Sequence, residues 1–429
     1  MKNFHKIVLF FGLLQLFCFF VVGDVRSQIT SNKHSHLTSP FSPLDVSGTW
    51  AADSSTGFTL REDHTSCAVN GKIYILGGDD GYNCLSTIQV FDPLSGIWST
   101  PATTGTFTPR SGLTSNVIEG KIYVIGGYDG NKRAYYNIIE IFDPSTNIWS
   151  TPSVAGTSTS RAYFASSVVN NKIYVMGGYD GHDFLNSLEV LDPSTNTWST
   201  PTATGTMTAR ASLTSNVIND KIYAIGGASN NNSVFNTLEI FDPSTNIWSA
   251  PATTGTFVAR FNGASSVVNG KIYVMGGSDS SDNILSDFQT FDPATNSWNT
   301  PVTTGAFTPR SNLSSSVLDN RIYAMGGWDS ILLNANEAFT PATDGVKMDT
   351  TPLDTKLFPN PTDGILTVYG VPVNALNITI ENVLGKTVLE HANPYSPSCT
   401  LDLSKLPSGT YFARLTTSSS VIIRKIVRE

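Results

Sequence analysis

The sequence predicts an all-β protein whose larger part consists of six copies of one four-stranded unit. Three observations support this: a regular internal repeat, short segments rich in Val, Ile and Tyr between turn residues, and a composition poor in charge. Only 14% of the 429 residues are charged, and 35 are glycines. One such unit cannot bury both faces of its own sheet, so neighbouring units must stack around an axis.

Four landmarks recur in step along residues 48–343. The Gly-Gly pairs are spaced by 49, 51, 49, 50 and 50 residues and begin at Gly77, Gly126, Gly177, Gly226, Gly276 and Gly326. The tryptophans are Trp50, Trp98, Trp149, Trp198, Trp248 and Trp298. The tyrosines are Tyr74, Tyr123, Tyr174, Tyr223, Tyr273 and Tyr323. The arginines are Arg61, Arg110, Arg161, Arg210, Arg260 and Arg310.

The repeated unit contains four short β segments separated by turn clusters. The third copy, residues 161–198, reads RAYFASSVVNNKIYVMGGYDGHDFLNSLEVLDPSTNTW. Its turn clusters are NN, DG and DPSTN, in which Asp can bond the backbone and Pro fixes φ. We expect Trp and Tyr to pack between units, and Gly-Gly to permit close backbone approach where the second strand ends.

The two ends of the repeat region predict how the ring closes. The chain enters with an isolated Trp segment at Trp50, before the first arginine, and the sixth unit ends after Glu337 without a Trp strand. The N-terminal strand should therefore complete the last blade and leave no open sheet edge.

These landmarks together resemble the kelch repeat, over roughly residues 50–343. The resemblance implies a six-bladed kelch β-propeller.

The first residues predict a secretory signal peptide. Lys2 and Lys6 precede the apolar stretch Ile7–Val22, and Ser27 offers a cleavage point, so we assign the signal peptide to 1–27 and a linker to 28–47. The alternative is an uncleaved membrane anchor, for which the stretch is short.

The repeat ends near residue 343, and a linker at 344–356 leads to a segment at 357–429. Alternating apolar residues there predict a small antiparallel β-sandwich. The motifs FPNPTDG, GK and L-PSGTY resemble, in order and spacing, the type A C-terminal sorting domain of the Bacteroidetes type IX secretion system. The resemblance implies the type IX secretion machinery as a partner, with delivery to the outer-membrane surface or the extracellular space, often followed by removal of the domain. The terminal basic stretch departs from the family's lysine-rich end, and the alternative is an accessory sandwich.

Composition also limits the function. A net charge of -8 argues against nucleic acid. No cofactor or metal is expected, because the chain has no CxxC and each DPSTN turn offers a single Asp. Cys67 and Cys84 could form a disulfide or stay free, and we expect a monomer.

One face of the propeller should carry the variable sequence. If strands alternate in direction, the arginine-bearing connections lie at the same end as the loops after Gly-Gly. Kelch domains that bind acidic peptides use arginines at this register, so the resemblance suggests an electropositive mouth made by the six arginines. The alternative is that each arginine pairs with a backbone carbonyl or a neighbouring Asp.

Residues that break the repeat are the other candidates for ligand binding, because the fold does not require them. Exposed aromatic rings beside amides suit stacking on sugars with hydrogen bonds. The candidates are Tyr163, Phe261, Asn262, Asn312, Tyr128, Tyr179 and Trp328. The alternative is that the aromatic residues cap the blades or touch the sorting domain.

We therefore expect a secreted binding or adhesion module that recognises glycans or acidic protein segments, and no enzymatic activity. One alternative is a kelch enzyme similar to the sialic-acid mutarotases, with Glu62 as general base. Another is a purely structural surface protein, which predicts a flat face without a pocket.

Overall fold

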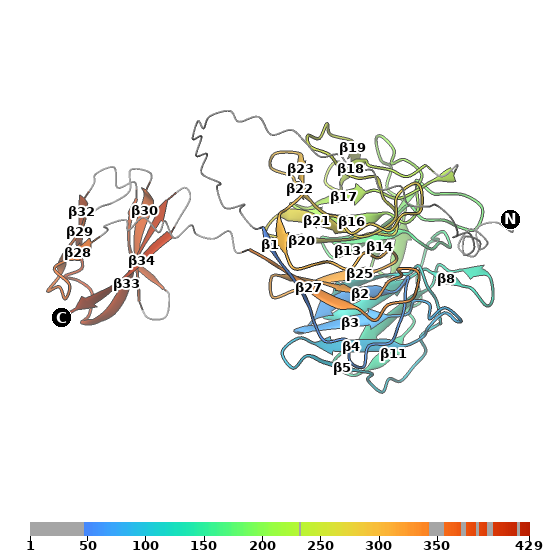
Figure 1. Ribbon diagram of the computed structural model, residues 1–429, viewed down its shortest axis with the longest axis horizontal. Coiled ribbons are helices and arrows are strands. Elements are labelled where there is room, and N and C mark those ends of the chain that lie inside the picture. Colours follow the sequence, from blue (N-terminus) through green and yellow to red (C-terminus); the bar gives the residue numbers. More distant parts are fainter. Residues whose placement is uncertain are drawn as a thin grey trace, which may run out of the picture. The chain divides into compact units, whose positions relative to one another are not determined.

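The computed structural model of the protein describes residues 47–230, 233–342, 356–369, 375–382, 386–392, 398–417 and 421–429. All regular elements in these ranges are strands, and most belong to four- or five-stranded sheets (Figure 1). Within the same ranges, no helix has the length and apolar character needed to span a bilayer. The predicted all-β class is confirmed, whereas the expected signal peptide lies outside the described residues.

The first five blades are antiparallel sheets whose strands follow chain order. Blade 1 has β2 (Thr65–Val69), β3 (Lys72–Leu76), β4 (Ile88–Asp92) and β5 (Ile97–Ser99). Blade 2 has β6 (Thr114–Ile118), β7 (Lys121–Ile125), β10 (Ile139–Asp143) and β11 (Ile148–Ser150). Blade 3 has β12 (Ala165–Val169), β13 (Lys172–Met176), β14 (Leu188–Asp192) and β15 (Thr197–Ser199). Blade 4 has β16 (Thr214–Ile218), β17 (Lys221–Ile225), β18 (Leu238–Asp242) and β19 (Ile247–Ser249), and blade 5 has β20 (Ala264–Val268), β21 (Lys271–Met275), β22 (Phe288–Asp292) and β23 (Ser297–Asn299).

The sixth blade is completed by the N-terminal strand, as the sequence predicts. It contains β25 (Ser314–Leu318), β26 (Arg321–Met325), β27 (Asn336–Pro341) and β1 (Gly48–Ala52), with the short β24 (Thr303–Thr304) parallel to β1. Strand β1 pairs antiparallel with β27, and the two ribbons run side by side in Figure 1. The Ala342 amide also donates to the Ser47 carbonyl at 2.9 Å, so the chain enters and leaves the propeller at one place.

The innermost strands β2, β6, β12, β16, β20 and β25 contact one another in a closed cycle. A side-chain hydrogen bond joins each neighbouring pair of these strands. The six bonds are Thr65–Ser115, Asn116–Ser166, Ser167–Ser215, Asn216–Ser265, Ser266–Ser315 and Ser316–Ser66. The last one, at 2.8 Å, joins residues 250 positions apart and closes the ring.

Aromatic side chains fill the space between blades, as expected. In one interblade cluster, Tyr74 of blade 1 packs with Phe142 and Trp149 of blade 2, and Phe107 stacks on Trp149 with centroids 4.4 Å apart. The Gly-Gly pairs lie where the next blade comes close. A Cβ atom on Gly226, whose φ is +65°, would be 2.7 Å from the Arg260 carbonyl oxygen of the next blade.

The C-terminal segment forms two small sheets around one core. One sheet has β28 (Lys356–Phe358), β29 (Ile365–Tyr369) and β32 (Ser398–Asp402). The other has β31 (Thr387–Ala392), β30 (Ala375–Asn382), β33 (Gly409–Thr417) and β34 (Val421–Arg428). Leu366 and Leu401 of the first sheet pack with Ile378, Ala413 and Ile426 of the second, which is the predicted sandwich.

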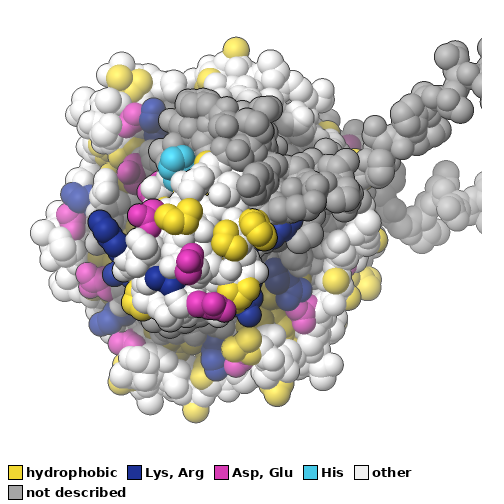
Figure 2. Space-filling model, turned by 90° about the vertical axis from the view of Figure 1, so that its left-hand side faces the viewer, with side chains coloured by type: hydrophobic (Ala, Val, Ile, Leu, Met, Phe, Trp, Pro, Cys, Tyr) yellow, Lys and Arg dark blue, Asp and Glu magenta, His cyan; other side chains and the backbone are white. Residues whose placement is uncertain are grey.

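The surface reflects the composition. On the face shown in Figure 2, most side chains are uncharged, and charges of both signs are interspersed. Cys67 and Cys84 are both free thiols, so the question that the sequence left open is answered against a disulfide.

Candidate functional site

The loop that follows each arginine lies beside the loop that follows Gly-Gly in the same blade. An isolated antiparallel bridge joins the two loops in every blade. The six bridges are Glu62–Asp79, Ser111–Tyr128, Ala162–Tyr179, Ala211–Ala228, Phe261–Ser278 and Ser311–Trp328. Both sets of variable residues therefore share one end of the propeller, which we call the loop face.

At the centre of the loop face, one residue per blade forms a closed backbone ring, which we call the collar. Each collar residue stands two positions after the arginine and has a φ between 52° and 61°. The amide of each donates to the carbonyl of the one before it, at 2.7–3.0 Å, and Asp63 closes the ring on Asn312. The collar residues are Asp63, Gly112, Tyr163, Ser212, Asn262 and Asn312.

The collar surrounds a hollow of about 120 Å³ on the axis. The collar residues line it together with the residue that follows each of them. Three predicted candidates, Tyr163, Asn262 and Asn312, meet here although about fifty to one hundred and fifty residues separate them in the chain. Asp63, Asn262 and Asn312 suit the left-handed backbone of a turn, which Asn and Asp adopt more readily than most residues.

The carboxyl group of Asp63 lines this hollow, and those of Glu62 and Asp79 lie near enough to act on it. Glu62 accepts a hydrogen bond from Asn312 Nδ2 at 2.6 Å, and the backbone of Glu62 bridges to Asp79. Burial raises the pKa of Asp63 well above its usual value, and the charges of Glu62 and Asp79 raise it further, against a hydrogen bond from Tyr163. Burial also raises the pKa of Glu62. The site therefore contains acidic groups that resist ionisation.

His64 lines the same hollow, a position that the sequence did not indicate. Its side chain is 6% exposed, and neither ring nitrogen makes a well-formed hydrogen bond, although the Met325 backbone lies nearby. Burial and the charges of Arg61 and Arg310 lower its pKa to about 3, so the ring is neutral at physiological pH. The other blades have Leu, Phe or Gly at this register.

The structure corrects the expected electropositive mouth. The six repeated arginines are at most 2% exposed and lie within the blades. In four blades the guanidinium donates to the carbonyl of the first glycine of the Gly-Gly pair, for example Arg161 to Gly177 at 2.8 Å and Arg210 to Gly226 at 2.9 Å. The alternative, in which each arginine pairs with a backbone carbonyl or a neighbouring Asp, describes these contacts with the glycine carbonyls.

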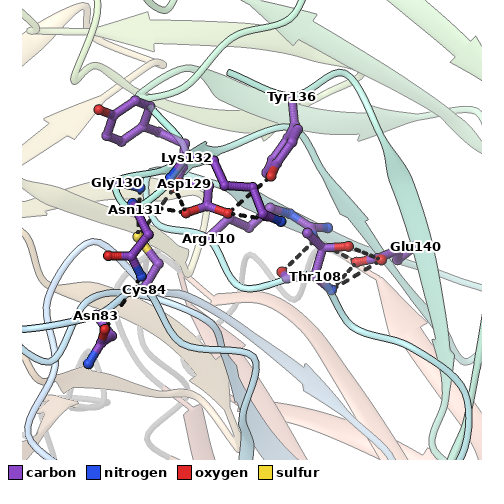
Figure 3. Close-up of polar contacts among 11 residues, drawn as sticks. Asn83, Cys84, Thr108, Arg110, Asp129, Gly130, Asn131, Lys132, Tyr136 and Glu140 are labelled. Carbon is purple, nitrogen blue, oxygen red and sulfur yellow. Dashed lines mark hydrogen bonds and ion pairs between the residues drawn. The ribbon is translucent and has the colours of Figure 1, made fainter. Parts of the chain in front are cut away.

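The partner of each arginine is a Glu or Gln on the third strand of the blade. Figure 3 shows the pair Arg110 and Glu140, with Thr108 donating to the same carboxylate. Glu189, Glu239 and Glu337 take this role in blades 3, 4 and 6. In blades 1 and 5 the partners are Gln89 and Gln289. Repeated arginines thus hold the variable loops onto the sheets.

A second aromatic group lies on the loops of blades 2 and 3. Tyr128 and Tyr135 belong to the hairpin of β8 (Tyr128–Asp129) and β9 (Ala134–Tyr135), with ring centroids 4.7 Å apart. Tyr135 also packs edge-on against Tyr179, at 5.7 Å. The predicted candidates Tyr128 and Tyr179 are therefore joined through Tyr135.

The hairpin is fixed by the buried carboxylate of Asp129 (Figure 3). It accepts hydrogen bonds from the Asn131 and Lys132 amides and from the Tyr136 hydroxyl, at 3.0–3.1 Å. Burial alone would raise the pKa of Asp129, but these hydrogen bonds outweigh it and leave the pKa lowered. The Cys84 thiol of blade 1 adds contacts to Tyr128 and Gly130.

The remaining candidates, Phe261 and Trp328, are half-buried in their loops and each takes part in a bridge on the loop face. Sequence reasoning missed Ser212 and His64, which line the axial hollow. Counting two and three positions from each arginine would have found Ser212 and His64, because every blade has the same register there. No group of three or more His, Cys, Asp or Glu side chains in the described ranges could hold a metal ion.

Comparison with known proteins agrees with this architecture. The family model for the KLHDC2/KLHL20/DRC7 Kelch-repeats domain matches residues 44–227 and 112–327, and the secretion system C-terminal sorting domain matches residues 356–429. Similar proteins include the Rab9 effector protein with kelch motifs from Xenopus laevis, 30% identical over 131 residues. That alignment covers 28% of this chain and 36% of the relative. The mouse protein of the same name is 29% identical over 113 residues, which are 26% of this chain and 30% of the relative.

The chain thus spans about a third of the length of these relatives. The two kelch matches together cover residues 44–327, well over half of the chain, and agree with the six blades. The sorting domain marks export by type IX secretion to the cell surface or the extracellular space. The chain belongs to the kelch-repeat family and is a secreted member of it, with a C-terminal sorting domain.

Proposed function

We propose that this secreted kelch protein is a non-catalytic binding module that takes a glycan on its loop face. The observation that carries the proposal is the collar. It brings the Asn262 and Asn312 amides, the Ser212 hydroxyl and the Asp63 carboxyl around one small hollow, beside the ring of Tyr163. Sugars need this combination, because their hydroxyls require many hydrogen-bond partners while their CH faces stack on aromatic rings.

The second aromatic group supports an extended ligand. Tyr135 packs against both Tyr128 and Tyr179, so the loops of blades 2 and 3 offer a second aromatic surface on the loop face. Tyr163 belongs to blade 3 and lines the hollow, and Tyr179 belongs to the same blade, so we propose a path along the loops of blade 3. An oligosaccharide can follow such a path, with one sugar at the collar and the next ones on the tyrosines.

The other ligand class expected from the sequence, acidic protein segments, lacks support. It depended on the six arginines, which are buried and paired inside the blades. The described residues that line the hollow include Asp63 and no lysine or arginine, so no cationic side chain there would attract an acidic ligand.

The two remaining alternatives are weaker for physical reasons. An enzyme acting on sialic acid would need cations for the sugar carboxylate, whereas Glu62, the suggested base, stands beside two further carboxyl groups. A purely structural surface protein predicts a flat face, and the axial hollow argues against it. No specific contact among the described residues supports either alternative.

The test is a glycan array probed with the secreted chain and with two side-chain deletions, Asn262→Gly and Asn312→Gly. Glycine is safe at these positions because blade 2 already has Gly112 in the collar, with a φ of 61°. Each deletion removes hydrogen bonds worth about 0.5–1.5 kcal/mol, so we expect a loss of roughly two- to tenfold in affinity for each. The matched control is Asn269→Gly, at a φ of 51° in the turn between β20 and β21 at the opposite end.

An array without retained glycans would refute the proposal. Glycan hits that both collar variants keep at full strength would also refute it, because the ligand would then bind elsewhere.

A further inference from the structure

The ring of residues that follow the collar residues is incomplete in one blade. Each residue of this ring lines the hollow. In five blades its side chain also fills the space beside the first glycine of the preceding blade's Gly-Gly pair. A Cβ atom on that glycine would lie 2.6–3.1 Å from the side chain. The five residues are His64, Leu113, Phe164, Leu213 and Leu313.

The sixth position, in blade 5, is Gly263, which has no side chain to place between blades 4 and 5. The three atoms nearest to a Cβ on Gly226, the glycine that faces this space, all belong to Arg260. The Leu and Phe residues of the ring are members of the buried clusters between blades. Among the described residues, the cluster between blades 4 and 5, with Ile225 and Phe257, has no such member. The space is therefore open and lies beside an apolar cluster, and we call it the blade 5 notch.

The backbone of blade 5 does not require glycine at this position. Gly263 has no positive φ, unlike both glycines of every Gly-Gly pair. A Cβ on Gly263 would lie 3.2 Å from the carbonyl oxygens of Met275 and Gly276, a close approach that small shifts can relieve. Five other blades carry a side chain at the same register. The missing side chain is thus explained better by the room that it leaves than by the conformation of the chain.

The mouth of the blade 5 notch is polar and uncharged. The collar residues beside it are Ser212 of blade 4 and Asn262 of blade 5, and the Asn262 backbone amide donates to the Ser212 carbonyl at 3.0 Å. A hydroxyl and a side-chain amide can each donate and accept hydrogen bonds. A group that fits here has an apolar end for the notch and a neutral polar part for the collar.

We infer that the sugar held at the collar carries an acetamido group, whose methyl enters the blade 5 notch while its amide bonds to Ser212 and Asn262. A methyl gains by leaving water for an apolar space, whereas a hydroxyl there would lose its hydrogen bonds. A deoxy sugar also carries a methyl, but it has no amide for the two collar side chains. This inference rests on the proposed glycan binding and names the class of sugar.

The decisive comparison uses three hexasaccharides with the same β-1,4 linkage: the N-acetylglucosamine hexamer, the glucosamine hexamer and cellohexaose. They place an acetamide, an amine and a hydroxyl at the same carbon atom. Binding to the secreted chain is measured by calorimetry at low and high salt. We expect the N-acetylglucosamine hexamer to bind at least tenfold more tightly than the other two, and to keep that advantage in high salt, because the contacts are uncharged.

The variant Gly263→Leu fills the notch with the side chain that blades 2, 4 and 6 have at this register. We expect the N-acetylglucosamine hexamer to fall to the affinity of cellohexaose, whose own binding should stay unchanged. Gly263→Ala, which adds one carbon atom, should reduce the preference severalfold and serves as the second variant if leucine lowers the melting temperature. The matched control Ser297→Ile gives blade 5 the residue that blades 1, 2 and 4 have on their outer strand, and it should keep the preference.

The outcomes separate the inference from the proposed function. If the N-acetylglucosamine hexamer has no advantage, or does not bind, the inference is overturned, and glycan binding stands as long as the array retains any glycan. An array without any glycan overturns both. A preference that persists unchanged in Gly263→Leu and Gly263→Ala also overturns the inference, because the acetamido group would then be recognised elsewhere.

Discussion

Replacing a repeated arginine should lower the free energy of unfolding much more when its partner is Glu than when its partner is Gln. In blade 2, Arg110 is fully buried, and its ion-pair partner Glu140 is only 3% exposed. Arg110→Met leaves that carboxylate buried with only Thr108 as a donor. Removing one member of a buried pair costs about 3–5 kcal/mol.

Blade 5 provides the control within the same molecule. Arg260 donates to the neutral Gln289 at 2.6 Å, and its acidic partner Asp287 has a side chain that is 30% exposed. Arg260→Met therefore leaves no unpaired buried charge. The loss in the free energy of unfolding should be about 1–3 kcal/mol, from hydrogen bonds alone. The double variant Arg110→Met/Glu140→Gln should recover most of the difference, since no unpaired charge remains.

The assay is urea unfolding followed by tryptophan fluorescence, with Trp149 reporting close to Arg110 through Phe107. The pH gives a second readout. A stranded Glu140 has a raised pKa in the folded state, so the stability of Arg110→Met should fall as pH rises through the acidic range, relative to Arg260→Met. Equal losses for the two single variants at every pH would refute the account of the arginines given above.

Four further outcomes follow from the same contacts. The pKa of Asp63 is raised in the folded protein, so folding favours the protonated carboxyl group. The stability that this group contributes is lost as pH rises above 3.8, and Asp63→Asn should flatten this part of the curve of melting temperature against pH. Gly226→Ala should cost more than about 2 kcal/mol in urea unfolding, because the new Cβ meets a backbone oxygen, whereas Gly71→Ala, with open space around it, should cost about 1–2 kcal/mol for its positive φ alone. Burial raises the pKa of Cys67 to about 12, so mass spectrometry should find it alkylated only after unfolding; labelling of the native protein at neutral pH would contradict this. Trp50→Ala should cost about 3–5 kcal/mol and loosen the seam of the ring, and a melting temperature equal to that of the native chain would show that β1 is not required.

The fold could be predicted from the sequence because its signals are local and repeated six times. Trp50 without a preceding unit, and Glu337 without a following Trp strand, were enough to place the seam, and β1 pairs with β27 as expected. Repetition helped because each landmark is tested in six copies, so a chance match in one copy carries little weight.

The site could be predicted only in part, for a physical reason. The grouping of the two sets of loops at one end was correct, since strand alternation fixes which loops share an end of the sheet. The direction of the arginine side chains could not be obtained in this way. A repeated arginine beside a loop suits a ligand or a buried Glu equally well, and the residue that decides, Glu140 in blade 2, lies thirty residues further along the chain. A Glu or Gln at the same register of every third strand was the signal that sequence reasoning overlooked.

The seam also determines how the molecule bears mechanical load. Strand β27 lies between β1 and β26 and is hydrogen-bonded to both, and it is the last strand before the sorting domain. A pull directed along β27 loads both ladders in shear, so their bonds must break together instead of one by one. Ring closure by the N-terminal strand therefore acts as a mechanical clamp, at the point where a propeller held by its tail would feel the drag of a bound ligand.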